Sequence, residues 1–180
     1  MRYVVIALII LISVLLMCGI FVRFPVFSAE IDSLTVTMVL MLFFERQLTP
    51  VLYTAVGGII IDSLFSRSFG FYTIPYIISG LIAFLYIEDK KPEGILPAMV
   101  ISGAVYLVKE LISMVLCVLL SYDFDIVRRL LTTVLPGIAL QMAAAAVSYY
   151  LFKWLHSFAF MQSAHDPEYE LLRKRRRRRR

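Results

Sequence analysis

Residues 3–22 read YVVIALIILISVLLMCGIFV, a run of 20 residues without a charged side chain. A helix that rises about 1.5 Å per residue over this run would match a hydrocarbon core about 30 Å thick. The whole chain has 180 residues, is 61% hydrophobic and has a mean hydropathy of +0.84. A soluble domain of this size could not bury so much apolar surface. The sequence therefore predicts an all-α membrane protein.

The same run could be a secretory signal peptide, because Arg2 gives it a positive start. However, the run is longer than the roughly 7–15 apolar residues of a typical signal core, and residues 21–25 lack a small-residue cleavage pattern. We therefore expect an uncleaved membrane anchor.

Apolar runs that are separated by charges, prolines and glycines predict a bundle of six transmembrane helices. The expected spans are residues 3–22, 31–45, 49–66, 71–88, 95–120 and 128–155. The second span is short and contains Asp32, so we expect a short, tilted or interior span instead of a full crossing. Residues 1–155 form the expected transmembrane domain, and residues 156–180 form a cytoplasmic polybasic tail.

Lysine and arginine residues are unequally divided between the two sides of this six-helix arrangement. One side receives thirteen of them, including eight in the tail, whereas the other receives Arg23, Arg67, Arg128 and Arg129. Basic residues are enriched on the cytoplasmic side of membrane proteins. Both termini are therefore expected in the cytoplasm.

Three of the predicted spans carry a face of small and polar residues. Residues four apart lie on one face of a helix, which groups Thr54, Gly58, Asp62 and Ser66 in the third span. The fifth span groups Ser102, Tyr106, Lys109, Glu110, Ser113 and Cys117, and the sixth groups Thr133, Gly137, Gln141, Ala144 and Ser148. Such faces allow membrane helices to approach closely and to form hydrogen bonds. We expect a structural or partner-binding role for Gly57, Gly58 and Gln141.

Asp62, Lys109 and Glu110 need polar partners, because a lone mid-membrane carboxylate costs about 2.5–3.5 kcal/mol. We expect Lys109 to pair with Asp62 across the third and fifth spans, and Glu110 to point to a cavity, a helix end or a partner protein. The alternative is that all three groups merely stabilise the bundle. Gly70 is expected to form the turn after the third span, where a positive φ favours glycine.

The tail carries the net charge of the chain. Its basic run consists of Arg173, Lys174, Arg175, Arg176, Arg177, Arg178, Arg179 and Arg180. Residues 166–180 have a net charge of +5, equal to that of the whole chain. We expect contact with anionic lipid headgroups, worth about 1 kcal/mol per basic residue. Nucleic-acid binding is not expected, because no interleaved aromatic residues or folded basic module accompany the run.

The sequence contains no pattern that is typical of catalysis. His156 and His165 have no metal-ligand spacing with another histidine, cysteine or carboxylate. Phosphate-binding loops, nucleophile elbows and dinucleotide fingerprints are absent from the sequence. An intramembrane hydrolase built on Asp62 would need a second carboxylate, for which Glu110 is the only candidate. We therefore expect no enzymatic activity, no metal and no cofactor.

Residues 57–70, GGIIIDSLFSRSFG, are the most distinctive segment, and the following span contains Tyr76 and Gly80. With six spans in about 160–180 residues, this pattern resembles the MreD family of bacterial rod-shape-determining membrane proteins. The resemblance covers most of residues 1–155, and Glu110 occupies a place where that family often carries an acid. Lys109, the weak second span and the arginine tail are less typical of the family.

The resemblance implies a non-enzymatic, multi-pass subunit of the elongasome, the bacterial cell-elongation complex, in the cytoplasmic (inner) membrane. Such a subunit binds an MreC-type bitopic protein and helps to couple actin-like filaments to peptidoglycan synthases. The fold of the family is similar to that of the substrate-binding subunits of energy-coupling-factor vitamin transporters. A small-molecule-binding transport subunit is therefore the alternative. Short, charged external connections and aromatic residues gathered near the span ends favour the scaffold.

Overall fold

A computed structural model describes residues 2–16, 31–65, 70–121 and 125–156, and every regular element within these ranges is a helix. The helices are α1 (Arg2–Leu16), α2 (Ser33–Glu45), α3 (Thr49–Phe65), α4 (Thr73–Lys90), α5 (Ile95–Leu119), α6 (Ile126–Arg129), the π-helical turn η2 (Leu130–Val134) and α7 (Leu135–His156). The predicted all-α fold is confirmed for this part of the chain. The helices follow the predicted spans, although residues 17–22 of the first span lie outside the described residues.

Among the described residues, two helices are long and apolar enough to cross a membrane. One is α5 with 25 residues, and the other is the continuous helix Ile126–Leu155 with 30 residues, which runs through α6, η2 and α7. Shorter apolar helices are Ser33–Glu45 and Thr49–Leu64. The length and composition of α5 and of the α6–α7 rod are those of membrane-spanning helices.

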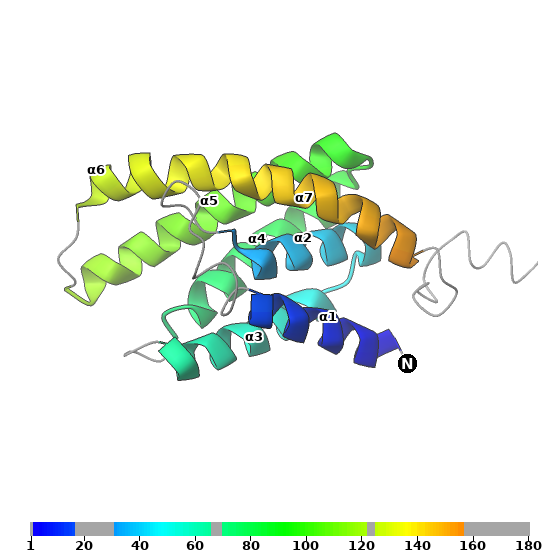
Figure 1. Cartoon of the computed structure of the whole chain (residues 1–180), viewed down its shortest axis with the longest axis horizontal. Coiled ribbons are helices and arrows are strands. Elements are labelled where there is room, and N and C mark those ends of the chain that lie inside the picture. The colour runs from blue at the N-terminus through cyan, green and yellow to red at the C-terminus, as the bar shows by residue number, and fades with distance from the viewer. Residues whose placement is uncertain (1, 17–30, 66–69, 122–124, 157–180) are drawn as a thin grey trace, which may run out of the picture.

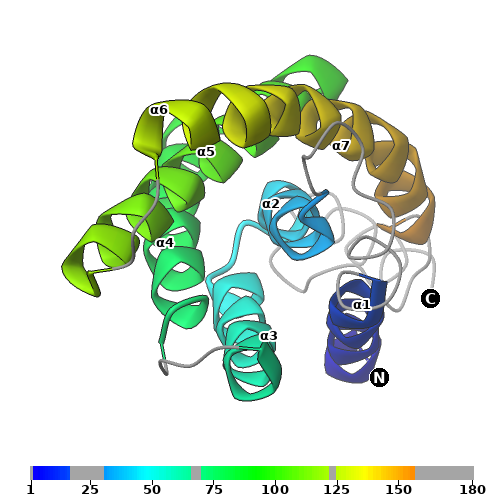
Figure 2. The same ribbon diagram turned by 60° about the vertical axis from the view of Figure 1, so that its left-hand side comes forward.

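The centre of the bundle is α2. It contacts α1, α3, α4, α5 and α7, and Figures 1 and 2 show these helices arranged around it. All residues from Leu34 to Phe43 are buried. The 13 residues of α2 rise only about 20 Å, which is less than a hydrocarbon core of about 30 Å. Of the interpretations of segment 31–45, the interior helix is the one observed.

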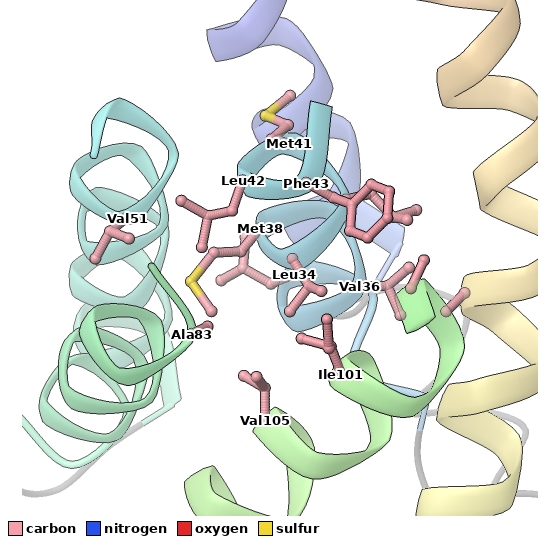
Figure 3. Packing of buried hydrophobic residues seen from close by; sticks show 14 of the residues in the cluster. Leu34, Val36, Met38, Met41, Leu42, Phe43, Val51, Ala83, Ile101 and Val105 are labelled. Carbon is pink, nitrogen blue, oxygen red and sulfur yellow. The ribbon is translucent and has the colours of Figure 1, made fainter. Parts of the chain in front are cut away.

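The hydrophobic core forms around α2. Met38 points toward Val51 of α3 and Ala83 of α4, while Ile101 and Val105 approach from α5 (Figure 3). These core residues are all buried. Segment 31–45 is therefore apolar because other helices of the bundle surround it.

Gly58 lies where α3 and α4 approach each other. A Cβ atom at this position would lie 3.0 Å from the Cα atom of Thr73 and 3.3 Å from the ring of Tyr76. A Cβ atom at the adjacent Gly57 would instead meet side-chain atoms of Leu34 at 3.2 Å. The sequence predicts that the small residues of α3 allow another helix to approach closely. At Gly58 the structure shows this approach, by α4.

We expect Gly58→Ala to lower the free energy of unfolding by about 1–3 kcal/mol, the usual cost of overpacking, because the added methyl group meets backbone that cannot rotate away. Gly57→Ala gains the same helix propensity but meets movable side-chain atoms, so its loss should be smaller. Thermal unfolding of the two variants in detergent micelles measures the difference. Equal stability would contradict the close packing of α3 on α4.

Candidate functional site

Asp32 begins a buried polar cluster at the N-terminus of α2. Its carboxylate accepts hydrogen bonds from the backbone N–H of Thr35 at 3.0 Å and from the Thr35 hydroxyl at 2.7 Å. The hydroxyl of Tyr76, on α4, lies 3.0 Å from both carboxylate oxygens. The Asp32 side chain is only 3% exposed. A carboxylate so far from water needs a counter-charge as well as hydrogen bonds.

Lys109 of α5 supplies that counter-charge. Its Nζ atom lies 2.8 Å from Asp32 Oδ2 and 2.8 Å from Glu110 Oε1. The ammonium also lies 5.6 Å from the ring centroid of Tyr76 and 5.0 Å from that of Tyr106. Both distances are within the range of cation–π attraction. Lys109 is thus surrounded by two carboxylates and two aromatic rings.

Glu110 connects this centre to the edge of the bundle. Its Oε2 atom lies 3.4 Å from Nη2 of Arg129, at the end of α6. The Arg129 side chain is 34% exposed, compared with 9% for Glu110. Asp32, Lys109, Glu110 and Arg129 therefore form a chain of alternating charges with no net charge, which runs from the buried centre toward the surface.

Gln141 of α7 fixes the backbone at the start of α2. Its side-chain oxygen accepts a hydrogen bond from the Asp32 N–H at 3.2 Å, and its Nε2 donates to the Asp32 carbonyl at 3.0 Å. Gln141 is fully buried. A hydrogen bond between membrane helices is worth about 0.6 kcal/mol on average, so this pair helps to join α7 to the central helix, as the sequence predicts for a polar face.

The π-helical turn η2 allows Arg129 and Gln141 to reach the same cluster. These residues are twelve positions apart, and an α-helix with about 100° per residue would rotate one from the other by about 120°. The i→i+5 pattern of a π-helix gives less rotation per residue. The turn at residues 130–134 therefore offsets part of that rotation.

Asp62 has a different set of partners, at the N-terminus of α4. Its carboxylate accepts hydrogen bonds from the backbone N–H groups of Tyr72 at 2.8 Å, Gly70 at 3.0 Å and Thr73 at 3.1 Å. The Thr73 hydroxyl donates a further bond at 2.5 Å. The first N–H groups of a helix lack partners within it and favour a negative charge nearby. Asp62, from α3, therefore caps α4.

The predicted pairing of Lys109 with Asp62 is wrong, because Lys109 pairs with Asp32 and Glu110 whereas Asp62 caps α4. The Glu110 carboxylate contacts Lys109 and also Arg129, at the end of α6, which agrees with the helix end among the places expected for it. Sequence reasoning did not include Asp32 in the site. The available signal was its N-cap pattern, an aspartate three residues before Thr35.

Several other predicted site residues have the expected positions. The polar face of α5 is buried, with Ser102, Tyr106, Lys109, Glu110, Ser113 and Cys117 all inside the bundle. Gly70 has a φ of +95°, as the predicted turn requires. Ser66 and the basic run Arg173–Arg180 lie outside the described residues, so their roles stay predictions.

The polar cluster consists of protein groups that satisfy one another. Both Asp32 oxygens and both Glu110 oxygens have hydrogen-bond or ion-pair partners within the chain. Within the described ranges, no group of three or more His, Cys, Asp or Glu residues could hold a metal ion. Satisfied buried networks rigidify a core and specify one arrangement of it. The polar cluster therefore stabilises the packing of the helices on one another.

The chain matches no family model, and no curated protein or solved structure is significantly similar to it. In the part of the chain that the structure describes, the fold is all-helical, and two of its helices are long and apolar enough to cross a membrane.

We expect Arg129→Ala to lower the free energy of unfolding by about 1 kcal/mol, because the arginine is partly exposed and Glu110 keeps its contact with Lys109. Arg128→Ala is the matched control, because this neighbouring side chain is exposed and has no ion pair with another residue that the structure describes. Thermal unfolding of both variants gives the comparison. A loss from Arg129→Ala as large as that from substitution of Lys109 would show that the outer pair dominates the cluster.

Proposed function

We propose that this protein is a non-enzymatic integral membrane subunit of the bacterial cell-elongation complex. In this proposal it crosses the cytoplasmic membrane six times, with α2 as a short crossing inside the bundle, and both termini lie in the cytoplasm. It binds an MreC-type bitopic protein and helps to link actin-like filaments to peptidoglycan synthases. Its basic tail, residues 173–180, contacts anionic lipid headgroups.

The observation that carries the proposal is the helix junction that residues 57–70 build. The resemblance to the MreD family rests on this segment, and three of its residues build one helix junction. Gly58 permits the close approach of α3 and α4, Asp62 caps α4, and Gly70 adopts a positive φ and donates its N–H to Asp62. Because the two glycines and the aspartate act together in one junction, they support the resemblance to the MreD family, which rests on the same residues.

The alternative is a small-molecule-binding subunit of a vitamin transporter. The centre of the bundle is occupied by α2, and the polar groups at its start bond to one another. A groove of about 290 Å³ between α4 and α5 is lined almost entirely by apolar side chains. Ligand sites are usually about 300–1,000 Å³ with several polar groups that orient the ligand. These features favour the scaffold over vitamin transport.

Affinity purification from detergent-solubilised bacterial membranes tests the proposal. The tagged full-length protein is expected to recover a single-span membrane protein of the MreC type, identified by mass spectrometry. An unrelated tagged multi-span protein, purified in parallel, controls for non-specific recovery. A co-purifying vitamin or a bound ATPase module would contradict the scaffold and support the transport subunit.

A further inference from the structure

An apolar groove lies between α4 and α5, with a volume of about 290 Å³. Its floor includes Ser79 and Ala83, which are 0% and 2% exposed. Its rim includes Ile82, Tyr86 and Val100, which are 49%, 52% and 58% exposed. The groove is therefore open to the surroundings of the bundle along its rim and closed by small residues below.

The dimensions of the groove suit one alkyl chain. Its lining runs from Ser79 to Tyr86 on α4 and from Val100 to Val108 on α5, which is about 10–12 Å at 1.5 Å per residue. A volume of about 290 Å³ over that length corresponds to a channel narrower than a helix, whose diameter is about 10–12 Å. A transmembrane helix of a partner would not fit inside it, whereas an acyl chain would.

One end of the groove meets two lysines. Lys90 lies four residues after Tyr86 and so continues the same face of α4, and Lys91 follows as the helix C-cap. Lys90 lies 3.2 Å from Asp89, but both side chains are more than 60% exposed. Such an exposed pair is weak, so a phosphate can replace the carboxylate.

Carboxylates lie on the same turn, and they limit how strongly an anion would be held. Glu88 is exposed, and Glu93 lies 3.7 Å from Arg46. The C-terminal end of α4 therefore carries both positive and negative side chains beside the apolar groove. The two adjacent lysines lie where the α4 side of the groove ends. An amphiphile with a phosphate headgroup and an alkyl chain matches this combination.

We propose that the α4–α5 groove binds one acyl chain of a membrane phospholipid, whose phosphate contacts Lys90 and Lys91. The proposal does not depend on the cell-elongation function, because it concerns the groove alone. Its occupant belongs to the bilayer that surrounds the helices.

Native mass spectrometry of the full-length protein, with added phosphatidylglycerol, tests this site. Ala104→Phe places a large ring on the groove lining, and it is expected to reduce by one the number of phosphatidylglycerol molecules retained. Ala143→Phe makes the same change at an exposed position of α7 and is expected to bind as the unaltered protein does. The basic tail is common to all variants, so its lipid contacts cancel in the comparison.

The double variant Lys90→Ala/Lys91→Ala tests the headgroup contact without a change in the groove. Each lysine beside an anionic headgroup should contribute about a fivefold factor in affinity, so phosphatidylglycerol binding is expected to weaken by an order of magnitude or more. The affinity for diacylglycerol with the same chains should not change. Unaltered retention in both Ala104→Phe and the double lysine variant would overturn the proposal.

Discussion

Replacing Lys109 by methionine is expected to lower the free energy of unfolding by about 3–5 kcal/mol, the usual result of breaking a buried ion pair from one side. The substitution would remove the counter-charge that Asp32 and Glu110 share at 2.8 Å. Two carboxylates would then stand near each other with little water to screen them. Unfolding in bicelles, measured against the unaltered protein, gives the size of the loss.

A double-mutant cycle identifies the partner of Lys109. In Asp32→Asn/Lys109→Met both members of the central pair are neutral, while Glu110 keeps Arg129, so the double variant should lose less stability than the two single variants together. Residues in one such network show coupling energies of about 0.5–3 kcal/mol. Asp62→Asn/Lys109→Met should be additive, because Asp62 caps another helix. Coupling at Asp62, with additivity at Asp32, would contradict the observed pairing.

Asp62→Ala is expected to lower the free energy of unfolding by about 3 kcal/mol or more, since each buried donor that loses its acceptor costs about 1–3 kcal/mol. The donors are the backbone N–H groups of Gly70, Tyr72 and Thr73 and the Thr73 hydroxyl. Hydrogen exchange provides a local measurement. In the variant these three amides should exchange faster than in the unaltered protein, and this increase should be larger than that of amides in the middle of α4.

Ser63→Ala is the matched control for the Asp62 substitution. Ser63 is the next residue along α3, it is exposed, and its hydroxyl donates to the Ile59 carbonyl at 2.8 Å within the same helix. Its loss should change stability by no more than about 0.5 kcal/mol, as is usual for surface substitutions. Unchanged exchange of the three capped amides in Asp62→Ala would show that the carboxylate does not cap α4.

The positions of the helices could be predicted because apolar runs and their breakers are local features of the sequence. The third predicted span, residues 49–66, coincides with α3 (Thr49–Phe65) as far as the described residues extend. The role of α2 was harder to predict, because its short length is compatible with both a tilted crossing and an interior helix. Only its contacts with five other helices distinguish the two.

The partners of the buried charges could not be predicted from spacing. Lys109 lies 77 residues from Asp32, and periodicity places each residue on a face of its own helix without showing which faces meet. Arg129 is a further example, since the predicted orientation placed it at an external connection. The π-helical turn that follows it has no clear signal in the sequence, yet it helps this arginine to reach Glu110.

The shape of living cells after depletion of the protein tests the proposed function most directly. The scaffold predicts that rod-shaped bacterial cells that depend on the protein become round as it is lost, while uptake of vitamins continues. Re-expression of the unaltered protein should restore the rods. Cells that remain rod-shaped and lose the uptake of a nutrient would contradict a role in cell elongation.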